Sequence, residues 1–362
     1  MKDERDLLRA TVSDLLAEHC TAERVAAAAS GDGWDAVLWQ ALEETGLTLV
    51  GSPEEAGGSG GDLAAAADIA VAAGAAAAPV PLAETLVAGM VLARAGLDIP
   101  AGPLTLSVAP DRDAWLRRVP YGRLATTVAV GADPAGDEWL AVVRQAGRVQ
   151  AGRNLAGEPR DEVEAGAEAE IRSVPAGLAD YGRGLLRLFR SLLIAGAAQR
   201  ALDLTVTYVN EREQFGRALA RFPTVQQEIA RMAGEVALIS AATQAAVAAE
   251  AGSAAGPSAV PGAVPGAVPG AVPSAVPGAV LAAVLAAKAQ ASESAGTVAA
   301  IAHQLHGAIG TTEEHRLRLT TTRLWSWRDE DSSAVECFAE LGRDALDAAR
   351  SGGGLWPWLT GE

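Results

Sequence analysis

The chain has 362 residues, and its 45 acidic residues outnumber its 29 lysines and arginines, which gives a formal net charge of −16. Such a chain lacks the broad basic surface that binds nucleic acids, and an anionic membrane surface would repel it. Hydrophobic residues make up 49% of the sequence and aromatic residues only 4%. The abundance of alanine and leucine favours helices, and the length predicts two or three domains with a substantial core.

The remaining compositional features indicate a cytoplasmic protein. Cys20 and Cys337 are the two cysteines, and they form no disulfide framework. The N-terminal segment is charged and amphipathic, without the apolar region of a signal peptide. The uncharged run over 251–287 is long enough to cross a bilayer, but proline and glycine interrupt it throughout. Since a spanning segment needs a continuous helix, we expect no membrane association.

Hydrophobic periodicity predicts the order of the elements. Helices are expected over 7–16, over 34–45 with Gly46 as the stop, and over 62–76 and 81–96. Short β-like runs follow at 104–108, 125–130, 139–143 and 168–174. Helical periodicity then returns in a stripe over 185–209 and in further stretches over 222–250, 281–308 and 313–349.

These elements predict a mainly α protein with three parts. We expect an N-terminal helical domain over 1–102, a reduced middle β domain over 103–175 and a C-terminal four-helix bundle over 176–350. A low-complexity insert of AVPG repeats occupies 253–280. Because proline recurs every fourth residue, this insert cannot be helical, and we interpret it as a disordered linker rather than a partner-binding element.

Four histidines raise the question of a metal site. His303 and His306 share a helix face, and Glu313, Glu314 and His315 follow closely. The pair lacks a second ligand pair at a diagnostic spacing, so we expect no metal.

Two segments of the helical half carry more information. One is Arg212-Glu-Gln-Phe-Gly216, followed by Phe-Pro-Thr-Val-Gln-Gln and Ala-Arg-Met, and the other begins Gln304-Leu-His-Gly307. An arginine at a helix end can bind a phosphate with its guanidinium fork, and glycine lets a ligand approach the backbone. Each segment taken alone is better interpreted as an ordinary turn between helices.

Together with Trp34 and the stretch Pro53-Glu-Glu-Ala-Gly-Gly-Ser-Gly-Gly61, these motifs resemble the acyl-CoA dehydrogenase family, in order and over nearly the whole chain. The resemblance implies an FAD enzyme that desaturates an acyl-CoA thioester between its α and β carbons. A carboxylate of such an enzyme removes the α-proton, and the flavin accepts the β-hydride.

The resemblance also assigns residues. It implies that Arg212 pairs with the FAD pyrophosphate, often that of a neighbouring subunit, and that Gln214 and Phe215 contact the cofactor beside it. Gln304 and Gly307 match the segment that meets the adenosine half of FAD. Ala308 stands where many relatives have a second glycine.

Arg187 matches an arginine near the active site, and we predict that it binds substrate. One branch of the family places its catalytic glutamate just before this arginine, where the chain has Leu186. The commoner position falls in a turn that holds Glu330 and Asp331. Either could be the base, but three consecutive acids beside Arg328 also suit a solvated turn.

The middle region departs most from the family. It lacks the T-E-P-x-x-G-S-D stretch and the W-I-T strand that hold the flavin ring in relatives. The chain thus resembles the short subunits of heteromeric actinobacterial acyl-CoA dehydrogenases that act on steroid or polyketide-like thioesters. Two hypotheses follow: a catalytic subunit of a homo-oligomer or heteromer, or a non-catalytic partner that completes the FAD site of a longer acyl-CoA dehydrogenase chain.

Overall fold

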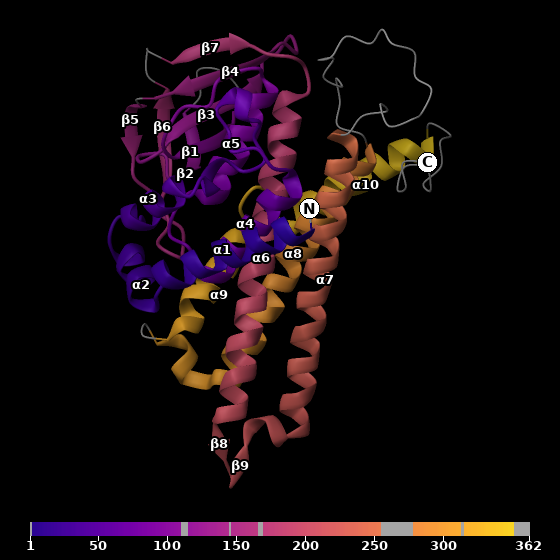
Figure 1. Cartoon of the computed structure of the whole chain (residues 1–362). Helices are drawn as coiled ribbons and strands as arrows, with labels where there is room; N and C mark the ends of the chain where they lie inside the picture. The colour runs from indigo at the N-terminus through magenta and orange to yellow at the C-terminus, as the bar shows by residue number, and fades with distance from the viewer. Residues whose placement is uncertain are drawn as a thin grey trace.

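The computed structural model describes residues 2–109, 115–144, 146–165, 169–254, 278–312 and 315–350. N-terminal helices, a small β module and a long helical bundle follow one another (Figure 1), which confirms the predicted mainly α fold class. Apolar side chains from all three parts belong to one buried cluster, for example Val12, Leu86, Leu106, Leu192 and Val298. The three parts therefore pack around a shared core.

Five helices and two short 3₁₀ turns form the N-terminal part. Asp35 begins α3 by accepting hydrogen bonds from the next turn, and its carboxylate also binds Arg24 at 2.7 Å. Gly46 has a φ of 71° and follows the end of α3, as predicted for a helix stop. The elements are α1 (Lys2–His19), α2 (Ala22–Ser30), α3 (Ala36–Glu44), η1 (Leu47–Leu49), η2 (Glu54–Ala56), α4 (Leu63–Ala76) and α5 (Leu82–Arg94).

The β module contains two small sheets, one in the order β1-β3-β4-β7 and one in the order β2-β6-β5. Strands β1 and β3 are parallel, and the other pairs are antiparallel. The sequence did not indicate β2, β5 or β6: β6 is mostly charged, β5 is an exposed edge strand, and β2 has two adjacent arginines among its five residues. The strands are β1 (Leu104–Val108), β2 (Leu116–Pro120), β3 (Thr126–Ala132), β4 (Glu138–Val143), β5 (Ala146–Gln150), β6 (Arg160–Ala165) and β7 (Glu170–Ser173).

Long helices make the C-terminal bundle, in which α6 packs against α7, α8 and α9, and α8 packs against α10. The predicted final helix over 313–349 is wrong, because a turn divides it into α9 and α10. The elements are α6 (Leu178–Glu211), β8 (Glu213–Gln214), β9 (Arg217–Ala218), η3 (Leu219–Arg221), α7 (Pro223–Ala254), α8 (Gly278–His306), η5 (Gly307–Thr311), α9 (Arg316–Trp327) and α10 (Ala334–Arg350).

Helices α4 and α6 cross at unusually short range. A Cβ added to Gly196 would lie 1.9 Å from the carbonyl oxygen of Val71, and one added to Gly74 would lie 2.2 Å from that of Leu193. Only glycine permits this contact, which fastens the N-terminal helices to the bundle.

Helix α7 is the described helix that is long and apolar enough to cross a membrane, yet only 33% of its most apolar window is buried. It is a bundle helix that packs against α8 and α6. The AVPG insert follows α7, and its residues 255–277 lie outside the described residues.

Candidate functional site

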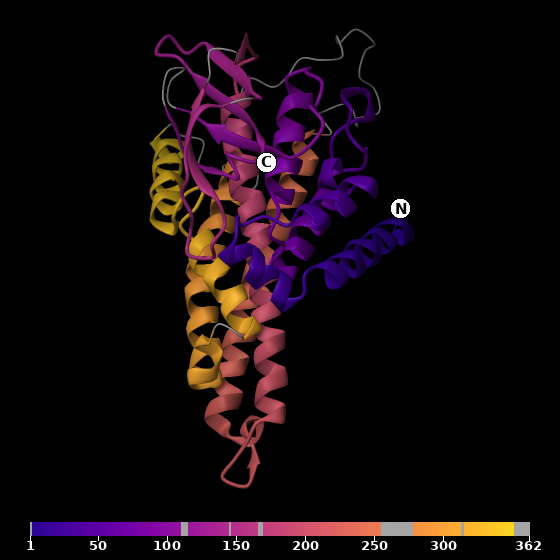
Figure 2. The ribbon, with the colours of Figure 1, turned by 90° about the vertical axis from the view of Figure 1, so that its left-hand side faces the viewer.

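The Arg212 segment forms a hairpin at the far tip of the bundle (Figure 2). Strands β8 and β9 pair across a two-residue loop, and both loop residues have positive φ, 53° for Phe215 and 78° for Gly216. This is the pattern of a type I′ turn, which favours glycine or asparagine rather than phenylalanine. The Phe215 side chain is also 90% exposed. It gains no burial within this chain to offset its strained backbone.

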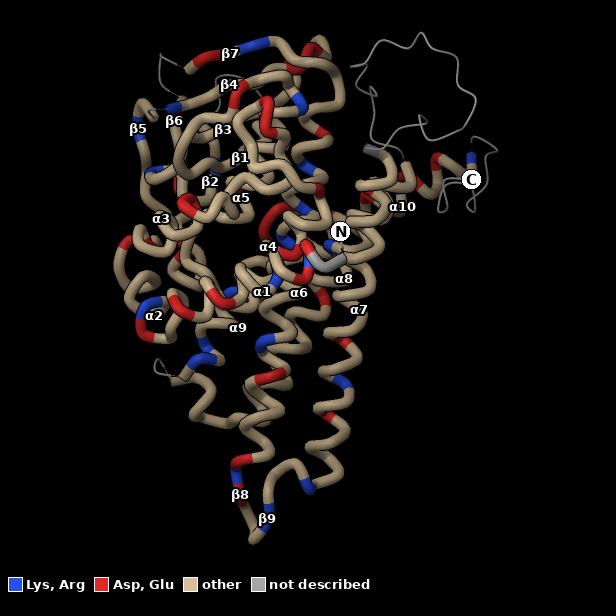
Figure 3. Tube along the Cα trace, viewed as in Figure 1, with Lys and Arg blue, Asp and Glu red and all other residues tan. Residues whose placement is uncertain are grey.

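Charged and aromatic groups surround this turn. Arg212 and Gln214 are both exposed, and Figure 3 shows acidic and basic residues together on the β8 side of the hairpin and basic residues on the β9 side. Phe215 packs edge-on against Phe222 at 6.2 Å between ring centroids, and the guanidinium of Arg217 lies 4.1 Å from the centre of the Phe222 ring. The tip thus presents aromatic faces and guanidinium donors to whatever approaches it.

The second predicted segment lies beside the hairpin's base. The Tyr208 ring, near the end of α6, stacks on His306 at 4.3 Å, and its hydroxyl donates to the His306 carbonyl. Gln304 is exposed on the last turn of α8, and Gly307 follows with a φ of 66° and open space where a Cβ would stand. The fold therefore brings all five predicted cofactor-binding residues to one end of the bundle.

Glu330 and Asp331 lie elsewhere, against the β module, since Glu330 accepts a hydrogen bond from Arg160 of β6. They occupy the turn between α9 and α10, where Asp331 and Ser332 have positive φ. Glu330 is 6% exposed, so the interpretation of a solvated acidic turn is wrong for this residue.

Two arginines hold the Glu330 carboxylate. Arg160 of β6 donates from Nε and Nη2 to its two oxygens at 2.9 and 2.7 Å, and Arg190 of α6 lies 3.4 Å from one of them. Asn154 donates a further hydrogen bond at 3.0 Å. Burial raises the pKa of Glu330, but the charges of Arg160 and Arg190 outweigh burial and lower it to about 2. The carboxylate is therefore ionised and a weak base.

The same arginines join further acids to this buried ion network. Glu158 contacts Arg160 at 3.0 Å and Arg323 at 3.1 Å, and Glu84 contacts Arg190 at 3.2 Å. Burial raises the pKa of Glu84 despite the opposing charge of Arg190. The cavity that touches Glu84, Glu158 and Arg190 has a volume of about 10 Å³. That space holds one water molecule at most.

Asp331 and Arg187 flank this network. The Asp331 carboxylate accepts a 2.8 Å hydrogen bond from Nε of Arg190. Arg187 is buried and pairs with Glu340 of α10 at 2.7 Å, and its Nε donates to Ser332 at 3.1 Å. The Arg187 guanidinium thus connects α6 with α10 and with the turn that precedes α10. The predicted role of Arg187 in substrate binding stays a prediction.

Three of the histidines form hydrogen bonds at helix ends, since His303 and His306 lie in the last turn of α8 and His315 precedes α9. His303 shares a hydrogen bond with Thr321 at 2.8 Å, His306 with the carbonyl of Ala302, and His315 accepts from the first turn of α9. Within the part of the chain that the structure describes, no group of three or more His, Cys, Asp or Glu side chains is placed to hold a metal.

Comparisons with known proteins identify the family. Residues 2–98 match the family model of the acyl-CoA dehydrogenase N-terminal domain, and residues 184–327 match that of its C-terminal domain. The chain belongs to the acyl-CoA dehydrogenase family. This membership confirms the resemblance seen in the sequence and makes the chain part of a family of flavoprotein oxidoreductases.

Two curated acyl-CoA dehydrogenases named IpdE2 are similar to this chain. The protein from Mycobacterium tuberculosis is 32% identical over 88% of this chain and 89% of its own length, and that from Mycolicibacterium smegmatis is 30% identical over 88% and 91%. Among solved structures, the ChsE4-ChsE5 complex from Mycobacterium tuberculosis has a TM-score of 0.80 at 21% identity, covering 95% of this chain and 97% of that one. The Tcur3481-Tcur3483 steroid ACAD has a TM-score of 0.79 at 23% identity, with coverage of 96% and 99%.

Sequence reasoning did not find the partners of Glu330 in this acyl-CoA dehydrogenase family member. Arg160 lies 170 positions earlier in a charged strand, and no local pattern distinguishes it from the other surface-like residues there. Arg190 lies three positions after Arg187 on α6, and this helical spacing was the one available signal.

Proposed function

We propose that this chain acts as a subunit of an oligomeric FAD-dependent acyl-CoA dehydrogenase. The tip of its bundle would contact an FAD that is bound mainly by a neighbouring subunit. The observation that carries the proposal is the separation of two groups of residues. Arg212, Gln214 and Phe215 are exposed at the tip, whereas Glu330 is buried beside the β module.

The residues at the tip suit the phosphate and adenosine half of FAD. Arg212 offers planar donors for a phosphate, and Gln304 offers an amide for hydrogen bonding. Phe215 is held outward at the cost of a strained backbone, and Gly307 leaves space for close approach. Bound FAD would supply hydride acceptance, and the chain's own residues would position it.

The exposed apolar surface of the bundle supports an oligomer. Helix α7 is apolar although two thirds of its most apolar window is not buried within this chain. Extended apolar surface of this kind is typical of subunit contacts.

The ion network favours the non-catalytic role over the catalytic one. A base must accept the α-proton, but the Glu330 carboxylate is bound by Arg160 and Arg190 and its pKa is lowered to about 2. Asp331 is similarly bound by Arg190. We therefore propose that the base belongs to a longer partner chain, which would bind the acyl-CoA, and that Glu330 has a structural role here.

Flavin content tests the proposal. The chain is purified alone and after co-expression with a longer acyl-CoA dehydrogenase from the same organism, and flavin absorbance per chain and oligomer mass are measured. We expect little flavin alone and a yellow complex with the partner. A self-sufficient enzyme that carries one FAD per chain and bleaches with acyl-CoA would contradict the partner role.

A pair of variants makes the test specific. Arg212→Ala removes a charge-assisted hydrogen bond and should weaken FAD retention by about 1.5–3 kcal/mol. Arg172→Ala removes an arginine that is also exposed, on β7 in the β module at the other end of the molecule, where it lies 3.5 Å from Glu170, and should leave flavin content unchanged. Equal flavin content in both variants would exclude the role of Arg212.

A further inference from the structure

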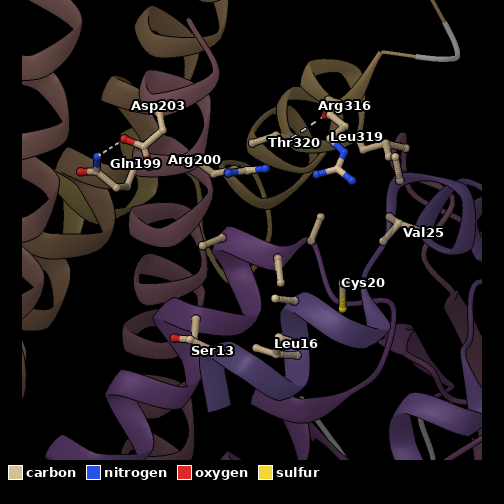
Figure 4. A pocket seen from close by; sticks show the side chains of 16 residues that line it. Ser13, Leu16, Cys20, Val25, Gln199, Arg200, Asp203, Arg316, Leu319 and Thr320 are labelled. Atoms are coloured by element: carbon tan, nitrogen blue, oxygen red, sulfur yellow. Dashed lines mark hydrogen bonds between the residues drawn. The ribbon is translucent and has the colours of Figure 1, made fainter. Parts of the chain in front are cut away.

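A second pocket lies between α1, α2, α4, α6 and α9, and its volume is about 350 Å³. This volume falls in the range of small-molecule sites. The close-up in Figure 4 shows its walls, which are made largely by small or apolar side chains, namely Leu16, Ala17, Val25, Ala72, Ala75 and Ala76.

Two arginines from different helices converge on this pocket. Arg200 extends from α6, and Arg316 is the first residue of α9. Their guanidinium groups reach toward each other across the opening in Figure 4. Among the described residues, neither guanidinium has a hydrogen-bond or ion-pair partner.

The two described acids near this pocket, Asp203 and Glu23, do not bridge the arginines. Asp203 lines the pocket, but its carboxylate accepts a 2.8 Å hydrogen bond from Gln199 and turns away from the arginines (Figure 4). Glu23 on α2 is fully exposed, and its pKa is lowered by its own backbone N–H, by Thr21 and, least, by the charge of Arg316. Within the described part of the chain, two positive charges thus approach one opening with no acid between them, and an anion placed there would relieve their repulsion.

The rest of the lining is uncharged. Burial raises the pKa of the Cys20 thiol to about 12, so this side chain is neutral and adds to the apolar wall. A ligand for this pocket therefore needs one anionic end and one apolar end.

We propose that this pocket binds a small amphiphilic anion, with a carboxylate or phosphate-monoester head between Arg200 and Arg316 and a compact apolar body against the alanine-lined wall. Guanidinium forks suit both head groups. This site is independent of the proposed dehydrogenase function, because its lining includes neither the bundle tip nor the ion network around Glu330.

Isothermal titration with defined probes tests the site on the full chain. The probes are acetate, butyrate, hexanoate, octanoate, hexyl phosphate and inorganic phosphate. Affinity should rise about fourfold for each added methylene until the pocket is filled. Hexyl phosphate against hexanoate shows which head group the site prefers. Absence of saturable binding for every probe, or equal affinity for inorganic and hexyl phosphate, would overturn the proposal.

Variants separate the two ends of the ligand. Arg200→Gln and Arg316→Gln should each weaken hexanoate binding at least about tenfold, since each removes a charge-assisted contact. The control Arg231→Gln, at an exposed position on α7, should bind like the unmodified chain. Ala17→Leu adds a larger side chain to the wall that α1 contributes to the pocket. This substitution should weaken octanoate binding and leave the affinity for acetate unchanged. Unchanged hexanoate affinity in both arginine variants would also overturn the proposal.

Discussion

Removing the charge of Glu330 should destabilise the protein markedly at neutral pH. Glu330→Gln keeps the shape of the side chain but leaves Arg160 and Arg190 without their shared anion in a buried site. The pKa of Glu330 is lowered from 4.5 to about 2. This difference of about 2.5 pKa units corresponds to about 3 kcal/mol of unfolding free energy.

The pH dependence of this loss follows from the direction of the shift. Because the pKa of Glu330 is lower in the folded chain, its stabilising contribution is complete above about pH 4.5 and is lost as the pH falls toward 2. The difference in unfolding free energy between the unmodified chain and Glu330→Gln should therefore be constant from pH 7 to pH 5 and shrink at lower pH.

Urea unfolding at several pH values, at one protein concentration, measures this difference. Asp329→Asn is the matched control, because Asp329 is the neighbouring acid and is exposed, so its effect should stay within about 0.5 kcal/mol. If Glu330→Gln unfolds at the same urea concentration as the unmodified chain at pH 7, the ion network does not stabilise the fold and the structural role of Glu330 is refuted.

Three further results are expected. Gly196→Ala should lower the unfolding free energy by about 1–3 kcal/mol, because the new Cβ would meet the backbone of α4. The control Gly234→Ala on α7 has open space around it and should raise the unfolding free energy by up to about 1 kcal/mol. Equal effects of the two substitutions in urea unfolding would exclude the close helix crossing. Phe215→Asn should relieve the strain of the left-handed backbone at this position and so raise the melting temperature slightly. The same substitution should reduce the flavin content of the co-expressed complex, and unchanged flavin content would argue against a cofactor contact. Burial lowers the pKa of Lys288 from 10.5 to about 8. The unfolding free energy of the unmodified chain relative to Lys288→Met should therefore rise by about 3 kcal/mol between pH 8 and 10.5. A difference in unfolding free energy that does not change over this pH range would contradict the prediction.

Local sequence patterns determined much of the fold. Helical periodicity placed α4, α5, α7 and α8, and alternation with turn residues placed β1 at its observed bounds. Gly46 marked the end of α3 because a left-handed residue is needed there. These features depend on neighbours within a few positions, so the sequence alone suffices to read them.

The motifs determined the family but not the arrangement of its site. Arg212 and Gln304 belong to recognisable segments, and only the folded bundle shows that these lie at one tip, far along the chain from one another and away from Glu330. The sequence also predicted a single helix over 313–349, where the structure has α9 and α10. The turn between these helices contacts Arg160 of the β module, and this long-range contact is not visible in the local sequence.

The state of Glu330 was decided by tertiary structure alone. Its local sequence, three acids after an arginine, has the composition of a solvated turn. The carboxylate is instead buried against arginines that come from β6 and α6. A charge can leave water only where a partner compensates it, and that partner is supplied by packing between distant segments rather than by sequence neighbours.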